Sequence, residues 1–91
     1  MSGQPTVLIA DDSPTLRRIV STVLERAGFT VVVAEDGVEA VQGAFSSQPD
    51  AIILDVQMPR LSGYVAARLL KDDWQTAEIP IVLLTSLDAA S

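Results

Sequence analysis

Two continuous apolar runs, each ending in aspartate, most constrain how this chain can fold. Residues 7–10 (VLIA) run into Asp11 and Asp12, and residues 51–54 (AIIL) run into Asp55. Runs without polar alternation are typical of strands that are buried on both faces of a parallel sheet. If the two strands are neighbours, their backbones lie about 4.8 Å apart and the three carboxylates meet at one edge. Such crowding is unfavourable without a proton or a cation, so we expect a hard cation there.

The composition indicates one domain with a packed core and excludes several kinds of site. The chain has 91 residues, of which 48% are hydrophobic, and a formal net charge of −6. This acidic balance disfavours direct binding to nucleic acid or to an anionic membrane surface. The absence of cysteine and histidine excludes disulfides, zinc sites and histidine-based catalysis. With neither a signal-peptide pattern nor an apolar run near 20 residues, we expect a soluble, cytoplasmic protein.

Strand and helix patterns alternate along the chain. Further strands are predicted over residues 29–34 and 81–84, and helices are predicted after Ser13, after Asp36 and after the loop 56–63. This alternation predicts the α/β class, with a doubly wound parallel sheet, right-handed crossovers and helices on both faces. In such sheets the ligand site lies beyond the carboxyl ends of the strands.

The helices carry local signals for their ends and for their buried sides. Ser13 can cap the first helix, Pro14 suits its first position, and Gly28 can end it in a left-handed conformation. Trp74 is expected to cover the end of the third helix. The apolar stripe of the first helix is expected to lie in the core: Leu16, Ile19, Val20 and Val23. Four residues of the third helix are expected to point inward: Val65, Ala66, Leu69 and Leu70.

The polar residues at the strand ends form a set suited to phosphoryl chemistry. Asp11 and Asp12 are expected to hold Mg²⁺, one directly and the other through water. Asp55 is the candidate nucleophile, because a carboxylate that attacks a phosphoryl group forms an acyl phosphate. The backbone carbonyl of Gln57 can complete the oxygen shell of the metal, and the Thr85 hydroxyl can donate to a phosphoryl oxygen.

These residues also have simpler structural interpretations. One residue of the acidic pair could cap the first helix, Asp55 could start a turn, and Thr85 could be an ordinary β-branched strand residue. Met58, Pro59 and Gly63 are interpreted as loop punctuation: the proline makes the loop rigid, and the glycine supplies permissive dihedrals near a helix start. Arg17, one turn into the first helix, could approach the site, but we favour its interpretation as a solvated surface charge. We favour the functional roles of the aspartates and the threonine because all of them fall at strand carboxyl ends.

At this point the chain resembles the receiver domain of two-component response regulators, similar to the chemotaxis response regulator. The resemblance is carried by Asp11-Asp12, by residues 55–59 with Gly63, and by residues 81–86. It implies a flavodoxin-like receiver with strand order 2-1-3-4. It also implies that Asp55 is a phosphoacceptor charged by a histidine kinase or a phosphotransfer protein. The implied Mg²⁺ ligands are Asp11, Asp12, Asp55 and the Gln57 carbonyl, and Thr85 is the implied switch hydroxyl.

The chain departs from the family in its length. A complete receiver has five strands and five helices, so we expect residues 1–91 to be a receiver domain lacking the fourth helix, fifth strand and fifth helix. The family's lysine at the end of the fifth strand then has no counterpart, because the single lysine of this chain is Lys71. The fourth strand is expected to be an apolar edge beside a bare sheet face, and we expect a homodimer through this edge.

Three other function classes can be compared with this interpretation. A phosphohydrolase similar to the haloacid dehalogenase group places a second acid two residues after its nucleophile, where this chain has Gln57. A nucleotide- or flavin-binding module needs a phosphate loop after the first strand, where the acidic pair would repel phosphate. The main alternative is a phosphorylation-deficient interaction module that associates through its exposed sheet edge. We favour a phosphoacceptor signalling module that is not itself an enzyme.

Overall fold

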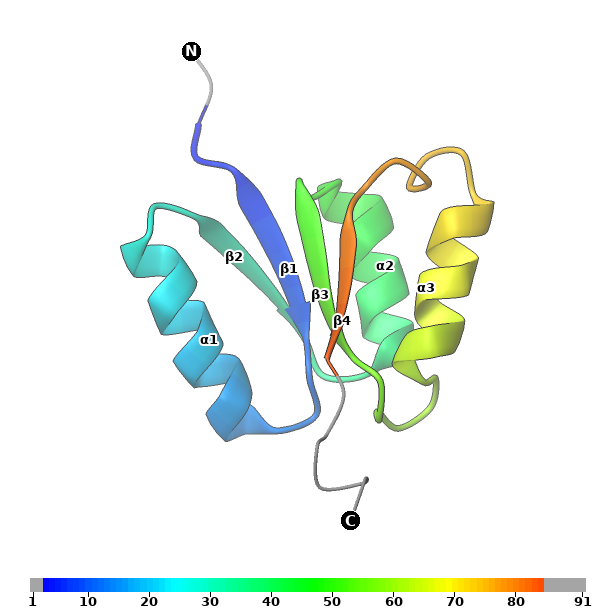
Figure 1. Cartoon of the computed structure of the whole chain (residues 1–91), viewed down its shortest axis with the longest axis horizontal. Coiled ribbons are helices and arrows are strands. Elements are labelled where there is room, and N and C mark those ends of the chain that lie inside the picture. Colours follow the sequence, from blue (N-terminus) through cyan, green and yellow to red (C-terminus); the bar gives the residue numbers. More distant parts are fainter. Residues whose placement is uncertain (1–2, 85–91) are drawn as a thin grey trace.

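The computed structural model describes residues 3–84, which form a parallel sheet with helices on both faces (Figure 1). The elements follow the chain as β1 (Thr6–Ala10), α1 (Pro14–Arg26), β2 (Thr30–Ala34), α2 (Gly37–Ser47), β3 (Ala51–Asp55), α3 (Gly63–Asp72) and β4 (Ile81–Leu84). The strand order is β2-β1-β3-β4, and every neighbouring pair is parallel. The predicted fold class and strand order are both confirmed. None of the helices in residues 3–84 is both long and apolar enough to span a membrane.

The register of the two central strands determines where the site forms. Ala10 on β1 pairs with Leu54 on β3, so Asp11 and Asp55 each come one residue after this pair. Strand β1 is covered on both faces, and its residues 7–10 are all buried, whereas β3 buries Ile52 and Leu54 fully and leaves Ile53 half-buried. The sequence thus brings the two acidic positions to the same edge of the sheet.

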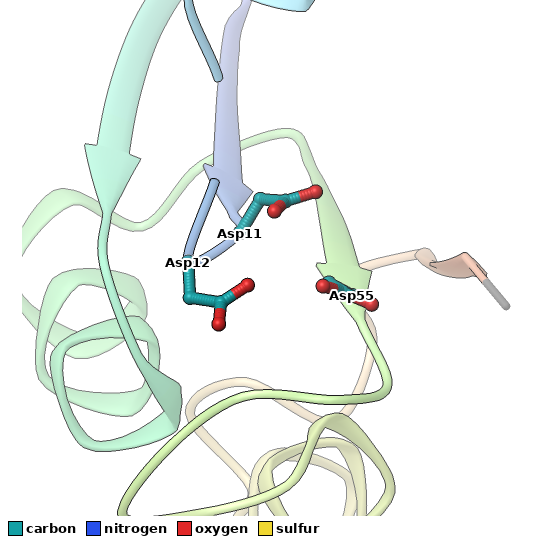
Figure 2. Close-up of side chains that lie close together, drawn as sticks. All are labelled: Asp11, Asp12 and Asp55. Atoms are coloured by element: carbon teal, nitrogen blue, oxygen red, sulfur yellow. The ribbon is translucent and has the colours of Figure 1, made fainter. Parts of the chain in front are cut away.

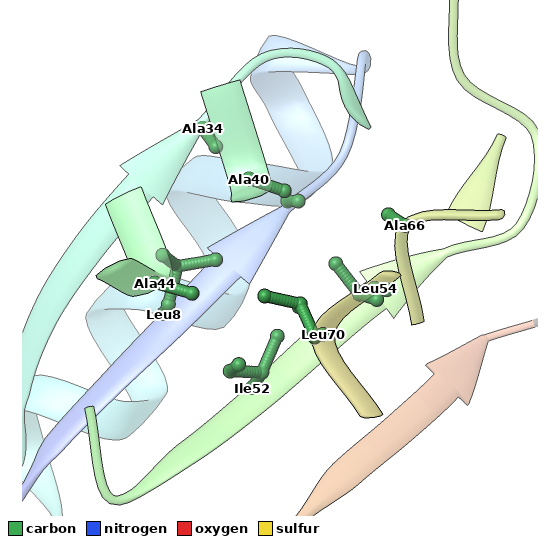
Figure 3. Close-up of a cluster of buried hydrophobic side chains, with 9 residues drawn as sticks. Leu8, Ala34, Ala40, Ala44, Ile52, Leu54, Ala66 and Leu70 are labelled. Carbon is green, nitrogen blue, oxygen red and sulfur yellow. The ribbon is translucent and has the colours of Figure 1, made fainter. Parts of the chain in front are cut away.

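An apolar core fills the space between the sheet and the helices α2 and α3 (Figure 3). Alanines on both helices allow them to approach the strands closely, where larger leucine and isoleucine side chains fill the remaining volume. The buried members of this core cluster are Leu8, Ala10, Ala34, Ala40, Ala44, Ile52, Leu54, Ala66 and Leu70. Each loses its contact with water entirely or nearly so, which makes this face the main source of hydrophobic stabilisation.

Helix α1 begins and ends as the sequence predicts. The Ser13 hydroxyl accepts the Leu16 N–H at 3.2 Å, and Pro14 occupies the first helical position. Gly28 has φ +100°, and its N–H donates to the Glu25 carbonyl while the next N–H donates to the Leu24 carbonyl. This pattern of two bonds is a Schellman motif, which satisfies carbonyls that the helix end leaves free.

The predicted core position of the α1 stripe is wrong for three of its four residues. Leu16, Ile19 and Val23 are 48%, 54% and 62% exposed, whereas Val20 is half-buried. Helix α1 packs on β1 and β2, at the side of the sheet away from β4 (Figure 1). The exposed residues of this apolar stripe, Leu16, Ile19 and Val23, therefore lack a covering element among residues 3–84.

Strand β4 is an edge of the described sheet, as expected. Ile81 packs against the core cluster, so Val82 and Leu84 lie on the opposite face, the one that carries α1. Both are exposed. We call the exposed large apolar residues that α1 and β4 carry on this side of the sheet the bared face: Leu16, Ile19, Val23, Val82 and Leu84. Its existence agrees with the expectation that the sheet face beside the first helix is uncovered.

Two expectations for α3 are wrong. Val65 and Leu69 are exposed, and only Ala66 and Leu70 of the four predicted residues are buried. Trp74 is 85% exposed and does not cover the helix end. Thr76 does so instead: its side chain is fully buried and its hydroxyl donates to the Leu70 carbonyl at 2.6 Å. A hydroxyl can satisfy a carbonyl at the end of a helix, which an indole placed in solvent cannot.

Candidate phosphoacceptor and metal site

Three carboxylates converge at the carboxyl edge of the sheet. Asp11 and Asp12 follow β1, and Asp55 ends β3 (Figure 2). One carboxylate oxygen from each residue lies within 4.8 Å of the others. Asp11 is buried at 3% exposure, Asp55 is half-buried and Asp12 is exposed. The arrangement is therefore open to solvent on the side of Asp12 and closed behind Asp11.

Hydrogen bonds hold the turn between β1 and α1 in place. The Asp11 N–H donates to the Ala34 carbonyl of β2 at 3.2 Å, and its carboxylate accepts the Ser13 N–H at 2.8 Å. The Arg17 guanidinium donates to the Asp11 backbone carbonyl at 2.7 Å. The interpretation of Arg17 as a solvated surface charge is therefore wrong, because this side chain reaches back past the start of α1 and fixes the acidic turn.

The loop after β3 is anchored by a close approach to the start of α3. The Gly63 N–H donates to the Val56 carbonyl at 3.0 Å. A Cβ atom at position 63 would overlap the backbone carbonyl of Asp55 and lie 2.8 Å from the Val56 Cα atom. Glycine is needed here for lack of space, and not for the permissive dihedrals that the sequence suggested. The helix thus begins directly against the candidate nucleophile.

The electrostatics of the cluster act on Asp55. Burial raises the pKa of the Asp55 carboxyl, and the negative charges of Asp11 and Asp12 raise it further. The Gln57 N–H, which donates to the Asp55 carboxylate at 3.2 Å, opposes this rise in pKa. A cation between the three carboxylates would relieve the repulsion and favour the ionised form of Asp55.

The residues present fit a magnesium ion. All three side chains offer oxygen, which is the donor that Mg²⁺ prefers, and Mg²⁺ retains several waters that the open side of the cluster can accommodate. Oxygens around octahedral Mg²⁺ are separated by about 3–4 Å, so small side-chain rotations suffice to bring these groups onto one ion. The single lysine, Lys71, is bonded elsewhere: its ammonium donates to the Ala77 and Ile79 carbonyls at 2.9 and 2.7 Å.

Thr85 lies outside the described residues, and its role stays a prediction. The strand that precedes it does run beside the candidate nucleophile, because Leu84 of β4 pairs with Asp55. The Val56 N–H also donates to the Leu84 carbonyl at 3.0 Å.

One interaction near the site was missed by the sequence reasoning. Asp36 was used only to mark where a helix begins, but its carboxylate, which caps that helix, also accepts two hydrogen bonds from Arg60. The two residues are 24 positions apart, so no spacing rule pairs them. Arg60 also has φ +67°, a conformation that its sequence context did not signal.

The fold and the site together define the class of this protein. It is a doubly wound α/β protein with an acidic cluster at the carboxyl edge of its sheet, where the strand order reverses. The family model of the response regulator receiver domain matches residues 7–91, and the chain belongs to this family. The resemblance seen in the sequence is thereby confirmed.

Relatives and solved structures agree with this assignment. The DNA-binding dual master transcriptional regulator RpaA of Synechocystis is 41% identical over 83 residues, covering 91% of this chain and 34% of that protein. Protein PilH of Pseudomonas aeruginosa is 39% identical over 82 residues, covering 90% of this chain and 68% of that protein. The chain thus spans about a third of the length of the first of these relatives and two thirds of the second.

A solved structure with a metal ion is among the similar folds. The receiver domain of the sensor histidine kinase PA1611 from Pseudomonas aeruginosa has magnesium coordinated in its active site cleft. It matches with a TM-score of 0.87 and 31% identity, covering 94% of this chain and 70% of that one. The alternative interpretation, a phosphorylation-deficient interaction module, receives no support from these comparisons.

Proposed function

We propose that Asp55 accepts a phosphoryl group from a histidine kinase or a phosphotransfer protein in a reaction that requires Mg²⁺. The observation that carries the proposal is the convergence of three carboxylate oxygens within 4.8 Å at the ends of β1 and β3. Asp11, Asp12, Asp55 and the Gln57 backbone carbonyl would hold the ion. In this proposal residues 1–91 form one receiver unit. The unit works in the cytoplasm and accepts a modification without being an enzyme.

The chemistry is a group transfer onto a carboxylate. An Asp55 oxygen attacks the phosphorus of a phosphohistidine, the new O–P bond forms, and the N–P bond breaks with its electron pair returning to the imidazole. The Gln57 N–H holds one carboxylate oxygen, which leaves the other oxygen for attack. Bound Mg²⁺ would offset the charge that otherwise repels the phosphoryl group from the carboxylates. The Thr85 hydroxyl would donate to a phosphoryl oxygen and act as the switch.

Intact mass spectrometry and NMR test this proposal on the 91-residue chain. With Mg²⁺ and a small phosphodonor, we expect one added phosphoryl group, and none for Asp55→Asn. Beryllofluoride is expected to shift the backbone amide signals of Asp55 and Thr85 only when Mg²⁺ is present. Phosphorylation of the Asp55→Asn variant at the wild-type level, or no phosphoryl group on the wild-type chain, would contradict the proposal. Asp72→Asn on the exposed side of α3 serves as the matched control.

We also propose that the receiver unit self-associates, most simply as a symmetric dimer through β4 and the bared face. Five large apolar side chains are exposed there, and strand β4 carries no charged residue that would discourage pairing of its edge. Light scattering after size exclusion should give twice the monomer mass at high concentration, and Val82→Lys should return the chain to a monomer. A wild-type monomer at high concentration would contradict this proposal.

A further inference from the structure

A two-pronged ion pair joins the start of α2 to the loop between β3 and α3. The Arg60 Nε donates to Asp36 Oδ2 at 2.9 Å, and a terminal nitrogen of the same guanidinium donates to Asp36 Oδ1 at 3.2 Å. The Asp36 side chain is only 12% exposed. A planar guanidinium that meets a carboxylate in this way fixes orientation as well as distance.

Asp36 is itself held rigidly, so it can serve as an anchor. It is the N-cap of α2, and its Oδ1 accepts the Glu39 N–H at 2.9 Å. Residue 37 then packs directly on the same loop, because a Cβ atom on Gly37 would overlap the Leu61 carbonyl. The loop therefore contacts the start of α2 in two ways: the Arg60 guanidinium bonds to Asp36, and the missing side chain of Gly37 leaves room for Leu61.

The loop keeps a conformation that its own residues disfavour. Arg60 has φ +67°, in the left-handed region where side chains other than glycine are unfavourable. The Leu61 N–H donates to the Pro59 carbonyl at 2.7 Å across this tight turn. A strained residue persists only where the surrounding structure holds it, and here the Asp36 carboxylate does so.

We infer that the Asp36–Arg60 pair positions the β3–α3 loop so that the Asp55 carboxylate and the Gln57 backbone carbonyl are ready to bind the metal ion. Gln57 lies three residues before Arg60 in this loop, and its N–H holds the Asp55 carboxylate. Both members of the pair are positioning residues that do not touch the ion. The inference rests on the magnesium site of the proposed function.

For the removal of the Arg60 side chain, an effect of its charge alone and a positioning role predict opposite changes in Mg²⁺ affinity. Arg60 is a cation near the proposed ion, so removal of its charge would by electrostatics alone tighten Mg²⁺ binding. If Arg60 instead positions the loop, its removal weakens binding. Arg60→Gly is the informative change, because glycine accepts φ +67° and leaves the backbone unstrained.

The test is an NMR titration of the 91-residue chain with Mg²⁺, following the backbone amides of Asp12, Asp55 and Gln57. We expect Arg60→Gly and Asp36→Ser each to weaken binding by about threefold to tenfold, at or below the usual effect of partners outside the metal's own ligands. Serine remains a good helix cap, so Asp36→Ser removes the ion pair while retaining the cap. The double variant should bind no more weakly than the weaker single variant, because both changes break the same contact.

Arg68→Ala is the matched control, because it breaks an exposed ion pair with Asp72 on the outer side of α3 and should leave Mg²⁺ binding unchanged. Urea unfolding of each variant shows whether the loss of binding exceeds any loss of folded protein. Unchanged or tighter binding by Arg60→Gly, with a wild-type chain that does bind, overturns the positioning role alone. A wild-type chain that binds no Mg²⁺ overturns the proposed function and this inference together.

Discussion

The two faces of the sheet are made of similar residues but differ in how completely they are covered. On the side of α2 and α3, the central side chains are fully buried: Leu8, Ile52, Leu54 and Leu70. On the side of α1, Ile9 of β1 is equally buried, but the helix that covers it leaves Leu16, Ile19 and Val23 exposed. Covering an apolar strand and burying an apolar helix stripe are therefore separate requirements. Helix α1 covers β1, but most of its own apolar stripe stays exposed.

The largest expected effect comes from truncating matched leucines on the two faces. Leu54→Ala removes a fully buried side chain and should lower the free energy of unfolding by about 2–5 kcal/mol. Leu16→Ala removes a side chain that is 48% exposed and should cost less than about 1 kcal/mol. Urea unfolding monitored by circular dichroism measures both. Equal losses would remove the distinction between the two faces.

Two glycines offer a second test of the same contrast. Gly63→Ala places a Cβ atom against the Asp55 backbone on the tightly packed side, which should cost about 2–3 kcal/mol. Gly28→Ala at the end of α1 meets open space and should cost only about 1 kcal/mol for its φ of +100°. The same unfolding measurement applies, and a smaller loss for position 63 than for position 28 would contradict the close approach.

Buried hydroxyls extend the comparison to polar groups. Thr76→Val leaves the Leu70 carbonyl on the α3 side without its partner and should lower stability by about 1–2 kcal/mol. The Ser21 hydroxyl on α1 is buried without a partner among residues 3–84. Ser21→Ala should therefore raise stability by about 0.5 kcal/mol, since it removes an unpaired group and improves helix propensity. Thermal unfolding of both variants gives the two signs, and a loss for Ser21→Ala would show that its hydroxyl has a role.

The smallest expected effect on stability comes from Asp55, at the carboxyl edge of the sheet. Burial, with Asp11 and Asp12 nearby, raises the pKa of Asp55 in the folded chain. The folded state then binds this proton more tightly than the unfolded state, so stability falls as pH rises through the folded pKa. Asp55→Asn removes that loss and should slightly raise the Tm at pH 7 without Mg²⁺.

The advantage of Asp55→Asn should shrink as the pH falls toward 3.8, the ordinary pKa of an aspartate. Asp72→Asn on the exposed side of α3 should change the Tm little at either pH. Thermal unfolding in the presence of a chelator, at several pH values, makes the measurement. A gain for Asp55→Asn that does not depend on pH would mean that ionisation of Asp55 is not its cause.

Sequence reasoning succeeded where a local pattern has one structural solution. Continuous apolar runs gave the parallel strands, Ser13 and Gly28 gave the ends of α1, and strand ends gave the meeting of Asp11 with Asp55. These predictions depend on neighbouring residues and on the rule that parallel strands end at the same edge.

The wrong predictions have a common physical origin: each concerns a contact, or the lack of one, with a part of the chain that is distant in sequence. The stripe on α1 reports which side is apolar, but not whether a partner covers it, so Ile19 was wrongly placed in the core. The Arg60–Asp36 pair joins positions 24 residues apart, and Gly63 is needed because another backbone comes close. Amphipathic periodicity does not indicate which residues from distant parts of the chain come into contact, so it could predict neither the ion pair nor the close backbone approach.

The pairing of Leu84 with Asp55 connects the acidic cluster to the least supported strand. Among the described residues, β4 is bonded to the sheet along one side only, and its last carbonyl accepts the N–H of the residue that follows Asp55. A displacement of the backbone just after Asp55 would therefore pull on a strand with few other attachments. Amide hydrogen exchange along β4 would register such a displacement earlier than exchange in the doubly flanked strands β1 and β3.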